Sequence, residues 1–374
     1  MPGEPLPPMT LFLCGDVMTG RGIDQILPHP CEPHLFEPYM RSAEGYVALA
    51  EVACGPIRRP VDFAYIWGDA LSELERAGPH ARIINLETAV TVAEDAWPGK
   101  GINYRMHPDN VPCLTAARID CCVLANNHVL DWGYPGLKET LAMLRAAGIR
   151  TAGAGVDEDE AAAQAIVELD AGWRVLVFAF GHASAGVPAE WATREDRPGV
   201  NYLADLSSLT ADAISRHVAA SKRTGDVAVA SIHWGGNWGY SIPGGHREFA
   251  HRLIDAGGIN IVHGHSSHHP LGIEVYRGRL ILYGCGDFLN DYEGIPGHAS
   301  FRPELSLMFL PAIDPATGKL LSCGLIPMRI HGFRVNRASR DDAAWLQRRL
   351  AREGAQFGTR VGLETDGTLT LQWG

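Results

Sequence analysis

The sequence has no excess of positive charge. Its 374 residues include 32 lysines and arginines but 43 aspartates and glutamates, which gives a formal net charge of -11. Proteins that bind nucleic acids neutralise phosphates with a basic surface. We therefore expect no nucleic-acid partner. The negative charge agrees with ordinary solubility, and it would also suit attraction of a cation.

The sequence also lacks a long hydrophobic run. Residues 1–9 are rich in proline and contain no basic residue, and the apolar run 11–13 is too short for the core of a signal peptide. No later run reaches the roughly 20 apolar residues that cross a bilayer. We expect a cytoplasmic protein without a membrane partner.

Cysteine spacings typical of zinc sites are missing too. The chain has eight cysteines but no Cys-x-x-Cys motif, and several of them lie in apolar runs such as 121–124. In a reducing compartment this pattern favours buried thiols over disulfides or metal ligands.

Strand-like apolar runs alternate with helical patterns along most of the chain. Strands are expected at 10–14, 82–85, 121–125, 173–180, 226–232, 259–262 and 280–283. Helices are expected at 64–77, 111–117, 136–147, 209–222, 247–256 and 343–352. This alternation predicts a layered α/β architecture. After Arg302, the segments 305–310 and 320–330 flank a turn signal and predict an antiparallel pair.

The pattern indicates one main domain over residues 10–335. Residues 336–374 are expected to form a C-terminal helix and tail packed on the same domain. Residues 27–59 contain several prolines and little periodicity. We interpret that segment as an insertion, either a lid or a loop facing the substrate.

Polar residues follow five of the apolar runs. The motifs are Gly15-Asp16, Asn85-Leu86-Glu87, Asn126-Asn127-His128, Ile232-His233-Trp234 and the run from His263 to His268. Strand ends converge at one edge of an open α/β sheet, where such folds build their sites. Each motif alone is also typical of a turn, a cap or a hydrogen-bonded loop residue. Together the five favour a metal site.

The donor types suit a divalent cation. The candidate ligands are Asp16, Glu87, Asn127, His233, His265 and His268. Carboxylate and amide oxygens suit Mg, Mn or Ca, whereas imidazole suits Mn, Fe or Zn, so the identity of the metal stays open. No organic cofactor is expected.

Further residues are candidates for acid/base chemistry and substrate binding. His128 precedes Asp131 by three residues, and a carboxylate from Asp131 or Asp16 would orient its ring and raise its basicity. The alternative is a turn histidine that satisfies backbone groups. Candidate substrate contacts are Trp234, Trp238, Tyr240, Asp287 and Arg302. Core packing of the aromatic residues and a solvated loop around Asp287 are the competing interpretations.

Taken together, these motifs resemble the CapA family of poly-γ-glutamate synthesis proteins. The resemblance rests on the motifs at Gly15–Met18, Asn85–Thr88, Ala125–His128, His233–Gly235, Gly264–His268 and Gly286–Phe288. It implies a four-layer α/β/β/α sandwich similar to calcineurin-like metallophosphoesterases, with a C-terminal antiparallel contribution. It also implies Asp16, Glu87, Asn127, His233 and His265 around the metal, with His268 close and His128 as the acid/base.

The sequence departs from the wider superfamily at two points and from the CapA family's own pattern at a third. Met18 stands where the first motif usually has a histidine ligand, Glu87 stands where an aspartate usually bridges two metals, and Ser266-Ser267 replace a His-Pro pair. Because one usual ligand is missing, we expect one well-bound ion instead of two.

The expected activity is a metal-dependent reaction on a peptide. The main hypothesis is epimerisation of a Cα centre in a ribosomal, lasso-type precursor peptide, with His128 and His298, each oriented by an aspartate, on opposite faces. The alternatives are a metal-dependent hydrolase of amide or phosphate esters and a factor for capsule poly-γ-glutamate synthesis. A peptide is the expected partner.

Overall fold

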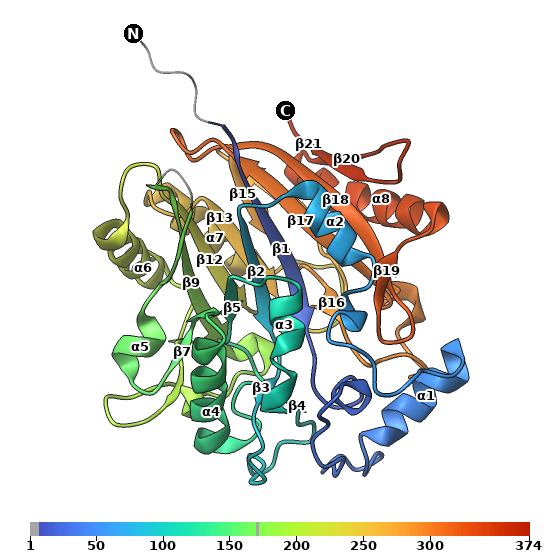
Figure 1. The fold of residues 1–374 in the computed structure, drawn as a ribbon. Coiled ribbons are helices and arrows are strands. Elements are labelled where there is room, and N and C mark those ends of the chain that lie inside the picture. Colours follow the sequence, from blue (N-terminus) through green and yellow to red (C-terminus); the bar gives the residue numbers. More distant parts are fainter. Residues whose placement is uncertain (1–6, 170–171) are drawn as a thin grey trace.

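Two β-sheets face each other across the centre of the molecule (Figure 1). The computed structural model describes residues 7–169 and 172–374, so most of the proline-rich segment 1–9 lies outside the described part. The ten-stranded sheet has the order β20 (Arg360–Leu363), β21 (Leu369–Gln372), β18 (Leu320–Ile330), β17 (Leu305–Ile313), β1 (Met9–Val17), β2 (Ala81–Leu86), β5 (Cys121–Val123) and β6 (Arg150–Ala152). In addition, β16 (Asp287–Leu289) pairs with β1, and β19 (Val335–Arg337) pairs with β18.

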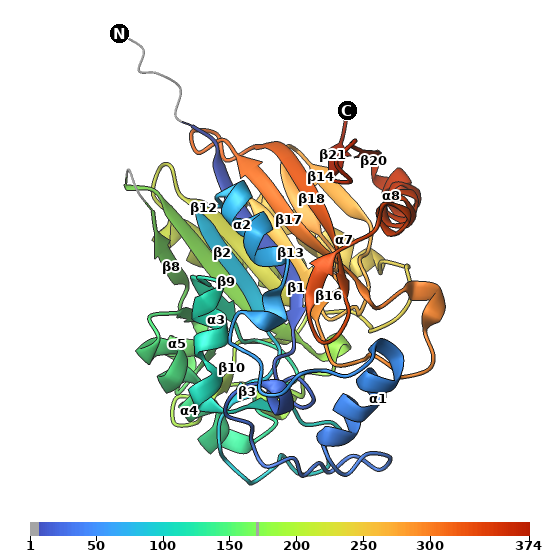
Figure 2. The ribbon, with the colours of Figure 1, turned by 45° about the vertical axis from the view of Figure 1, so that its right-hand side comes forward.

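The second sheet has seven strands. Its order is β11 (Tyr202–Leu203), β9 (Arg174–His182), β12 (Val227–His233), β13 (Ile261–His265), β15 (Arg279–Leu282) and β14 (Ile273–Tyr276), with β8 (Ala165–Glu168) paired to β9. Strands β9, β12, β13 and β15 are parallel, as are β1, β2, β5 and β6 in the first sheet. The carboxyl ends of both sets point toward the bottom of Figures 1 and 2, toward the loops around α1 and β3.

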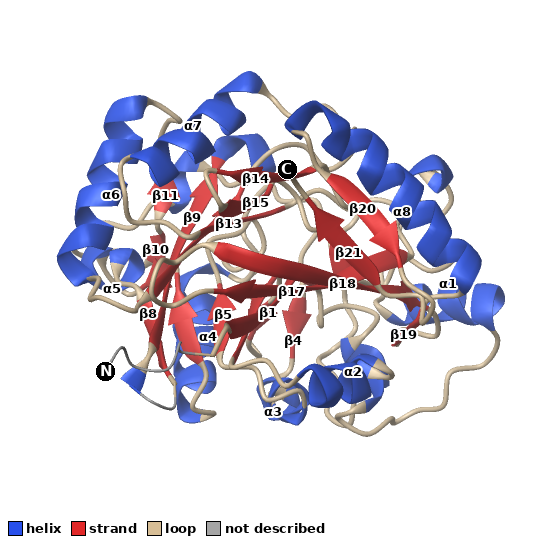
Figure 3. Ribbon diagram, turned by 90° about the horizontal axis from the view of Figure 1, so that it is seen from above, coloured by secondary structure: helices blue, strands red, loops and turns tan. Residues whose placement is uncertain are grey.

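Helices cover the outer faces of the two sheets (Figure 3). The ten-stranded sheet packs against α2 (Ala70–Ala77), α3 (Pro112–Ala116) and α4 (Gly133–Ala146), and the seven-stranded sheet packs against α6 (Ser208–Ser221) and α7 (Gly244–Asp255). Successive strand residues alternate between layers, so that Cys121 lies between the sheets while Cys122 faces the helices. The predicted four-layer α/β/β/α sandwich is confirmed.

The C-terminal residues extend the ten-stranded sheet. Helix α8 (Arg340–Gly354) begins at the N-cap Ser339, whose hydroxyl accepts a hydrogen bond from the Asp342 amide. The hairpin of β20 and β21 then follows, and β21 pairs with β18. The part of residues 336–374 that we expected to be a tail therefore contains two strands.

One local prediction is wrong, and one segment contains a helix that its sequence pattern does not indicate. A single helix was expected over 64–77, but a 3-10 turn at Tyr65–Trp67 ends at Gly68, and α2 begins after it. Gly68 has a φ of +47°, and a Cβ there would lie 2.6 Å from the Val335 carbonyl oxygen, so both conformation and space require glycine. The segment 27–59, which shows little periodicity and which we interpreted as an insertion, contains a helix, α1 (Glu44–Cys54).

Short elements complete the chain. They are α5 (Glu158–Ala162) and the two-stranded pairs of β3 (Ala89–Val90) with β4 (Arg105–Met106) and β7 (Ala154–Gly155) with β10 (Gly199–Val200). No helix within residues 7–169 and 172–374 combines the length and the apolar character needed to traverse a bilayer.

Candidate metal centre

The strand ends of the two sheets meet at one place. Asp16 lies near the end of β1, and the neighbouring strands β12 and β13 end at His233 and His265, which are register partners. Inside this meeting point, the His263 ring nitrogen Nε2 donates to the Cys14 carbonyl oxygen at 2.7 Å, so that one buried histidine links the two sheets. This bond helps to fix the separation of the donors from different sheets.

Asp16, His233 and His265 form a first donor group. One ligand atom from each lies within 4.8 Å of the others, and the three side chains are at most 1% exposed. The Nδ1 atoms of His233 and His265 face each other at 2.8 Å. At least one of these two facing nitrogens carries a lone pair in the neutral rings, which is the state that binds a cation.

Asp16 also belongs to a second donor group, with His268 and Asp287. The pairing of β16 with β1 sets Asp287 opposite Asp16, and His268 Nδ1 lies 2.8 Å from Asp287 Oδ1. The Asn290 amide donates to the other oxygen of Asp287 at 2.7 Å. Two groups of donors that could hold a cation thus share Asp16, and the second group places Asp287 among the donors.

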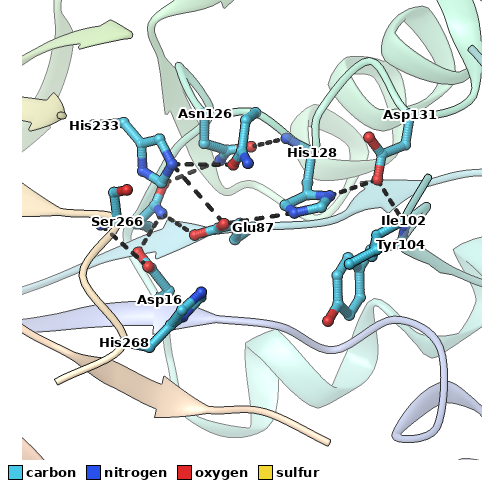
Figure 4. A network of polar contacts seen from close by, with 12 residues as sticks. Asp16, Glu87, Ile102, Tyr104, Asn126, His128, Asp131, His233, Ser266 and His268 are labelled. Atoms are coloured by element: carbon cyan, nitrogen blue, oxygen red, sulfur yellow. Dashed lines mark hydrogen bonds and ion pairs between the residues drawn. The ribbon is translucent and has the colours of Figure 1, made fainter. Parts of the chain in front are cut away.

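Glu87 lies beside the first donor group (Figure 4), and so does Asn127. The Asn127 oxygen is 3.0 Å from His233 Nε2, and Glu87 Oε1 is 3.9 Å from the same atom. The Asn85 amide nitrogen donates to Asp16 at 2.7 Å and to Glu87 at 3.1 Å. The six predicted metal ligands are therefore brought into one neighbourhood.

The electrostatics of these side chains suit a cation. Burial, together with the charge of Asp287, raises the pKa of Asp16 to about 7. Burial likewise raises the pKa of Glu87 well above its usual value and lowers the pKa of His233. Buried carboxylates that crowd one another and neutral imidazoles are both stabilised by a bound divalent ion, because the ion offsets the negative charge and takes the nitrogen lone pairs. The mixed oxygen and nitrogen donor set fits Mn, Fe or Zn.

His128 is held beside the donors by two partners. Its Nδ1 lies 2.7 Å from Asp131 Oδ2, and the Lys100 ammonium lies 2.5 Å from the other oxygen of Asp131. The second ring nitrogen, Nε2, is 3.8 Å from Glu87 Oε1. Tyr104 packs edge-on against the ring and donates its backbone amide to Asp131. His128 is therefore fixed in orientation, with Nε2 directed at the donors.

A cavity of about 360 Å³ opens above this arrangement. Its polar walls include Glu87, Lys100, Asn127, His128 and His268. Lys100 was missed at the sequence level, because it lies in the irregular segment between β3 and β4 and belongs to none of the polar motifs at strand ends. Among the described residues, no other lysine or arginine lines this cavity, so the Lys100 ammonium supplies positive charge near the donors.

The predicted aromatic wall separates into three different environments. Trp234 is 2% exposed, stacks on His246 and donates its indole N–H to the Tyr283 carbonyl, so it is a core residue and its assignment to substrate is wrong. Tyr240 packs on His269 and beneath the Arg349 guanidinium, and it does not line the cavity above the donors. Only Trp238 lies next to the donors, with its ring centre 5.2 Å from that of His268.

Two further assignments need correction. His298 is exposed and stacks on Trp238, and no aspartate among the described residues forms a hydrogen bond or ion pair with its ring, so the predicted orientation by an aspartate is wrong. Arg302 forms ion pairs with Glu304 and with Asp342 of α8. Its guanidinium thus ties the loop before β17 to α8, and Arg302 does not line the cavity above the donors, so its assignment to the substrate is not supported.

Comparisons with known proteins agree on one family. The family described as "Bacterial capsule synthesis protein PGA_cap" matches residues 10–292. A "Probable polyglutamine synthesis accessory protein" of Mycobacterium tuberculosis is 51% identical over 364 residues, which cover 97% of this chain and 96% of that protein. The "PGA biosynthesis protein CapA" of Bacillus subtilis is 27% identical over 210 residues, covering 55% of this chain and 52% of that protein.

The chain is also similar to a solved structure. That structure is a phosphatase from Mycoplasma pneumoniae, with a TM-score of 0.46 and 9% identity, and the match covers 89% of this chain and 95% of that chain.

Proposed function

Because this chain belongs to the bacterial capsule synthesis protein family PGA_cap, we propose that it is a divalent-metal-dependent hydrolase that cleaves an amide bond in a peptide-like substrate during polyglutamate synthesis. The observation that carries the proposal is the pair of donor groups that share Asp16, directly beside the His128–Asp131 pair. Such a site combines an acid/base residue with positions for Lewis-acid cations, as hydrolysis requires.

The donor residues fit the metal requirement. Asp16, His233 and His265 would hold one cation, and Asp16, His268 and Asp287 would hold another. When bound, a divalent cation supplies Lewis acidity toward an oxygen of the substrate. The Asn85 amide nitrogen donates a 2.7 Å hydrogen bond to Asp16 and so fixes the orientation of this carboxylate.

His128 would move the proton. Its Nδ1–H donates to Asp131, which fixes the tautomer and leaves Nε2 free to accept a proton on the side of Glu87 and the cavity. Burial lowers the pKa of His128 to about 4, so the ring is neutral at pH 7 and Nε2 can accept a proton from water. Returning that proton to the leaving nitrogen completes cleavage of an amide.

Lys100 would act through Asp131 and on the substrate. Its ammonium holds Asp131 by the 2.5 Å ion pair, and it lines the polar cavity at the same time. A positive charge there suits a substrate that carries a carboxylate, as a glutamyl chain does.

The geometry favours hydrolysis over epimerisation. Epimerisation of a Cα centre needs a second proton carrier on the opposite face of that carbon. The residue that we assigned to that role, His298, is exposed and stacks on Trp238 without an aspartate to orient it. Epimerisation therefore stays the second candidate.

One experiment separates the two. The purified chain, loaded with Mn²⁺ or Zn²⁺, is incubated in deuterium oxide with poly-γ-glutamate and with short α- and γ-linked glutamyl peptides, and the products are analysed by mass spectrometry. We expect shortened chains without deuterium at Cα. Deuterium at one Cα without cleavage would refute the hydrolase, and the His128→Gln variant serves as the control for either activity.

Location in the cytoplasm belongs to the same proposal. It is supported by the eight cysteines, all of which are free thiols and seven of which are buried. Fractionation of cells that express the chain with a C-terminal tag would test this location, and recovery in the membrane or secreted fraction would contradict it.

A further inference from the structure

A second cavity, which we call the apolar subsite, adjoins the polar cavity above the donors. Its volume is about 340 Å³. Ile102, Tyr104, His268 and Tyr292 line both cavities. Because the two share walls, one ligand can extend from the donors into the apolar subsite.

The other walls of this subsite come from segments outside the two large sheets. The insertion 27–59 supplies Tyr39, Met40 and Leu49, and the loop after β16 supplies Ile295. These side chains are aliphatic or aromatic, and they remain partly exposed: Tyr39 is 68% exposed and Ile295 is 40% exposed. Apolar surface that stays open to water beside a reactive site is typical of ligand binding.

Arg21 contributes no free charge to the subsite. Its guanidinium is bonded to Asp291 at 2.8 and 2.5 Å and to Glu37 at 2.9 Å, and it lies 3.7 Å from the ring centre of Tyr46. Two buried carboxylates therefore offset its single positive charge. A substrate carboxylate would meet no free cation there, whereas an apolar group would displace water from apolar walls.

Trp238 and His298 form an aromatic wall on one side. Their rings are parallel within 2° and 3.8 Å apart. This stack presents a flat surface beside His268, and flat aromatic surfaces pack well against aliphatic and aromatic groups. The two residues thus have a common position in the subsite, although neither holds the metal.

We propose that the apolar subsite receives an apolar side chain, up to an aromatic ring in size, that the substrate carries next to its reacting bond. The inference rests on the proposed function, because it takes the reacting bond to lie at the donors. A cavity of this volume is near the lower limit for ligand pockets, so it fits one such group and not a long chain. A polymer made only of glutamate offers no such group, so we expect a chain that carries an apolar residue beside its glutamyl residues to bind more tightly than an all-glutamate chain.

The test measures binding and cleavage separately. Three probes differ in one side chain: acetyl-Glu-Phe amide, acetyl-Glu-Ala amide and acetyl-Glu-Glu amide. Their affinities for the full chain loaded with Zn²⁺ are measured by calorimetry. Burial of the phenyl ring predicts that the Phe probe binds roughly 10- to 100-fold more tightly than the Ala probe, and that the Glu probe gains nothing. Equal affinities for the Phe and Ala probes would overturn the proposal.

Variants locate the preference. Ile295→Asp introduces a charge into the subsite and Leu49→Trp fills it, so the preference for Phe over Ala should fall below about threefold in both. Val52→Asp is the matched control, because Val52 lies on the same helix as Leu49 but is 89% exposed and lines neither cavity. A preference that survives in Ile295→Asp, whose partly exposed position makes misfolding a small risk, contradicts the proposal even if Leu49→Trp does not fold.

Cleavage of the same probes distinguishes this inference from the proposed function. Tight binding of the Phe probe that Ile295→Asp abolishes, without cleavage of any probe, would support the subsite and count against the hydrolase. Cleavage of all three probes with equal affinities would support the hydrolase and overturn the subsite.

Discussion

The metal donors and the walls of the apolar subsite are built in opposite ways. The shared donor Asp16 lies in a parallel strand and is fully buried, and its partners His233 and His265 end neighbouring strands in register. The subsite walls come from the insertion 27–59 and from loops, and Tyr39 and Ile295 remain open to solvent. We infer from this difference that the sheets fix the positions of the metal donors and that the loops determine which substrate binds. This division is common in layered α/β proteins.

The largest effect is expected from Asp16→Ala, which removes a metal donor and leaves the walls of the apolar subsite unchanged. Because both donor groups need this carboxylate, cation binding should be lost at both positions and hydrolysis should fall below detection. The fold should persist, since the change removes one of several buried carboxylates that repel one another. Hydrolysis of glutamyl peptides and circular dichroism check this, with Glu75→Ala, an exposed carboxylate, as the control. Full activity in Asp16→Ala would refute the donor assignment.

His128→Gln should separate proton transfer from metal binding. The ring lies 3.8 Å from Glu87 and belongs to neither donor group, so the metal content should not change. The rate should fall by roughly 100- to 10,000-fold, which is the usual contribution of a general acid/base. Single-turnover rates and metal analysis on the same sample measure both quantities. Loss of the metal together with the activity would make His128 a ligand and remove it from the proton-transfer role.

Arg21→Met tests the segments that form the walls of the apolar subsite. It leaves the buried carboxylates of Asp291 and Glu37 without their partner, which should lower the free energy of unfolding by about 3–5 kcal/mol. Arg252→Met breaks a more exposed pair with Asp212 and should cost no more than about 1 kcal/mol. Urea unfolding gives both values. Equal costs for the two variants would show that the Arg21 cluster does not brace the subsite walls.

Removal of the metal should have a smaller effect on stability than Arg21→Met. A cation present at 100 times its dissociation constant stabilises the folded state by about 2.7 kcal/mol, so a chelator should lower the melting temperature by the corresponding few degrees. Asp16→Ala should show no such shift, because its donor groups are incomplete. An equal response of the two proteins to the chelator would place the stabilising cation elsewhere.

The sequence predicted the metal donors at the strand ends well, and the reason is physical. An apolar run of strand length that ends in a polar motif marks the carboxyl end of a buried strand, and parallel strands align such ends. The predicted strands before Asp16, Glu87, His233 and His265 all occur, and β1 continues as far as Val17.

Residues that reach the site through contacts between distant segments could not be predicted in the same way. Asp287 reaches the donors because β16 pairs with β1, a contact between segments about 270 residues apart that no local pattern reveals. Trp234 and Trp238 are four residues apart in similar surroundings, yet one is in the core and the other lines the subsite. Lys100 lies in an irregular segment, and only its position in space relates it to Asp131.

The expected number of ions shows the same limit of sequence-based prediction, because a local motif does not reveal contacts with distant segments. Met18 in the first motif argued for one ion, because a usual histidine ligand is missing there. The structure brings His268 and Asp287 to Asp16 from another part of the chain and completes a second donor group. Donors from distant segments that converge on the same strand end can therefore stand in for a ligand that is missing from one motif.

The central claim is that Asp16 joins two cation positions, and metal stoichiometry tests it most directly. Mass spectrometry of the metal content, after saturation with Mn²⁺ or Zn²⁺ and removal of free ions, should give two ions per chain for the native sequence, one for His265→Ala, one for Asp287→Ala and none for Asp16→Ala. An Asp16→Ala protein that folds and retains both ions would contradict the account.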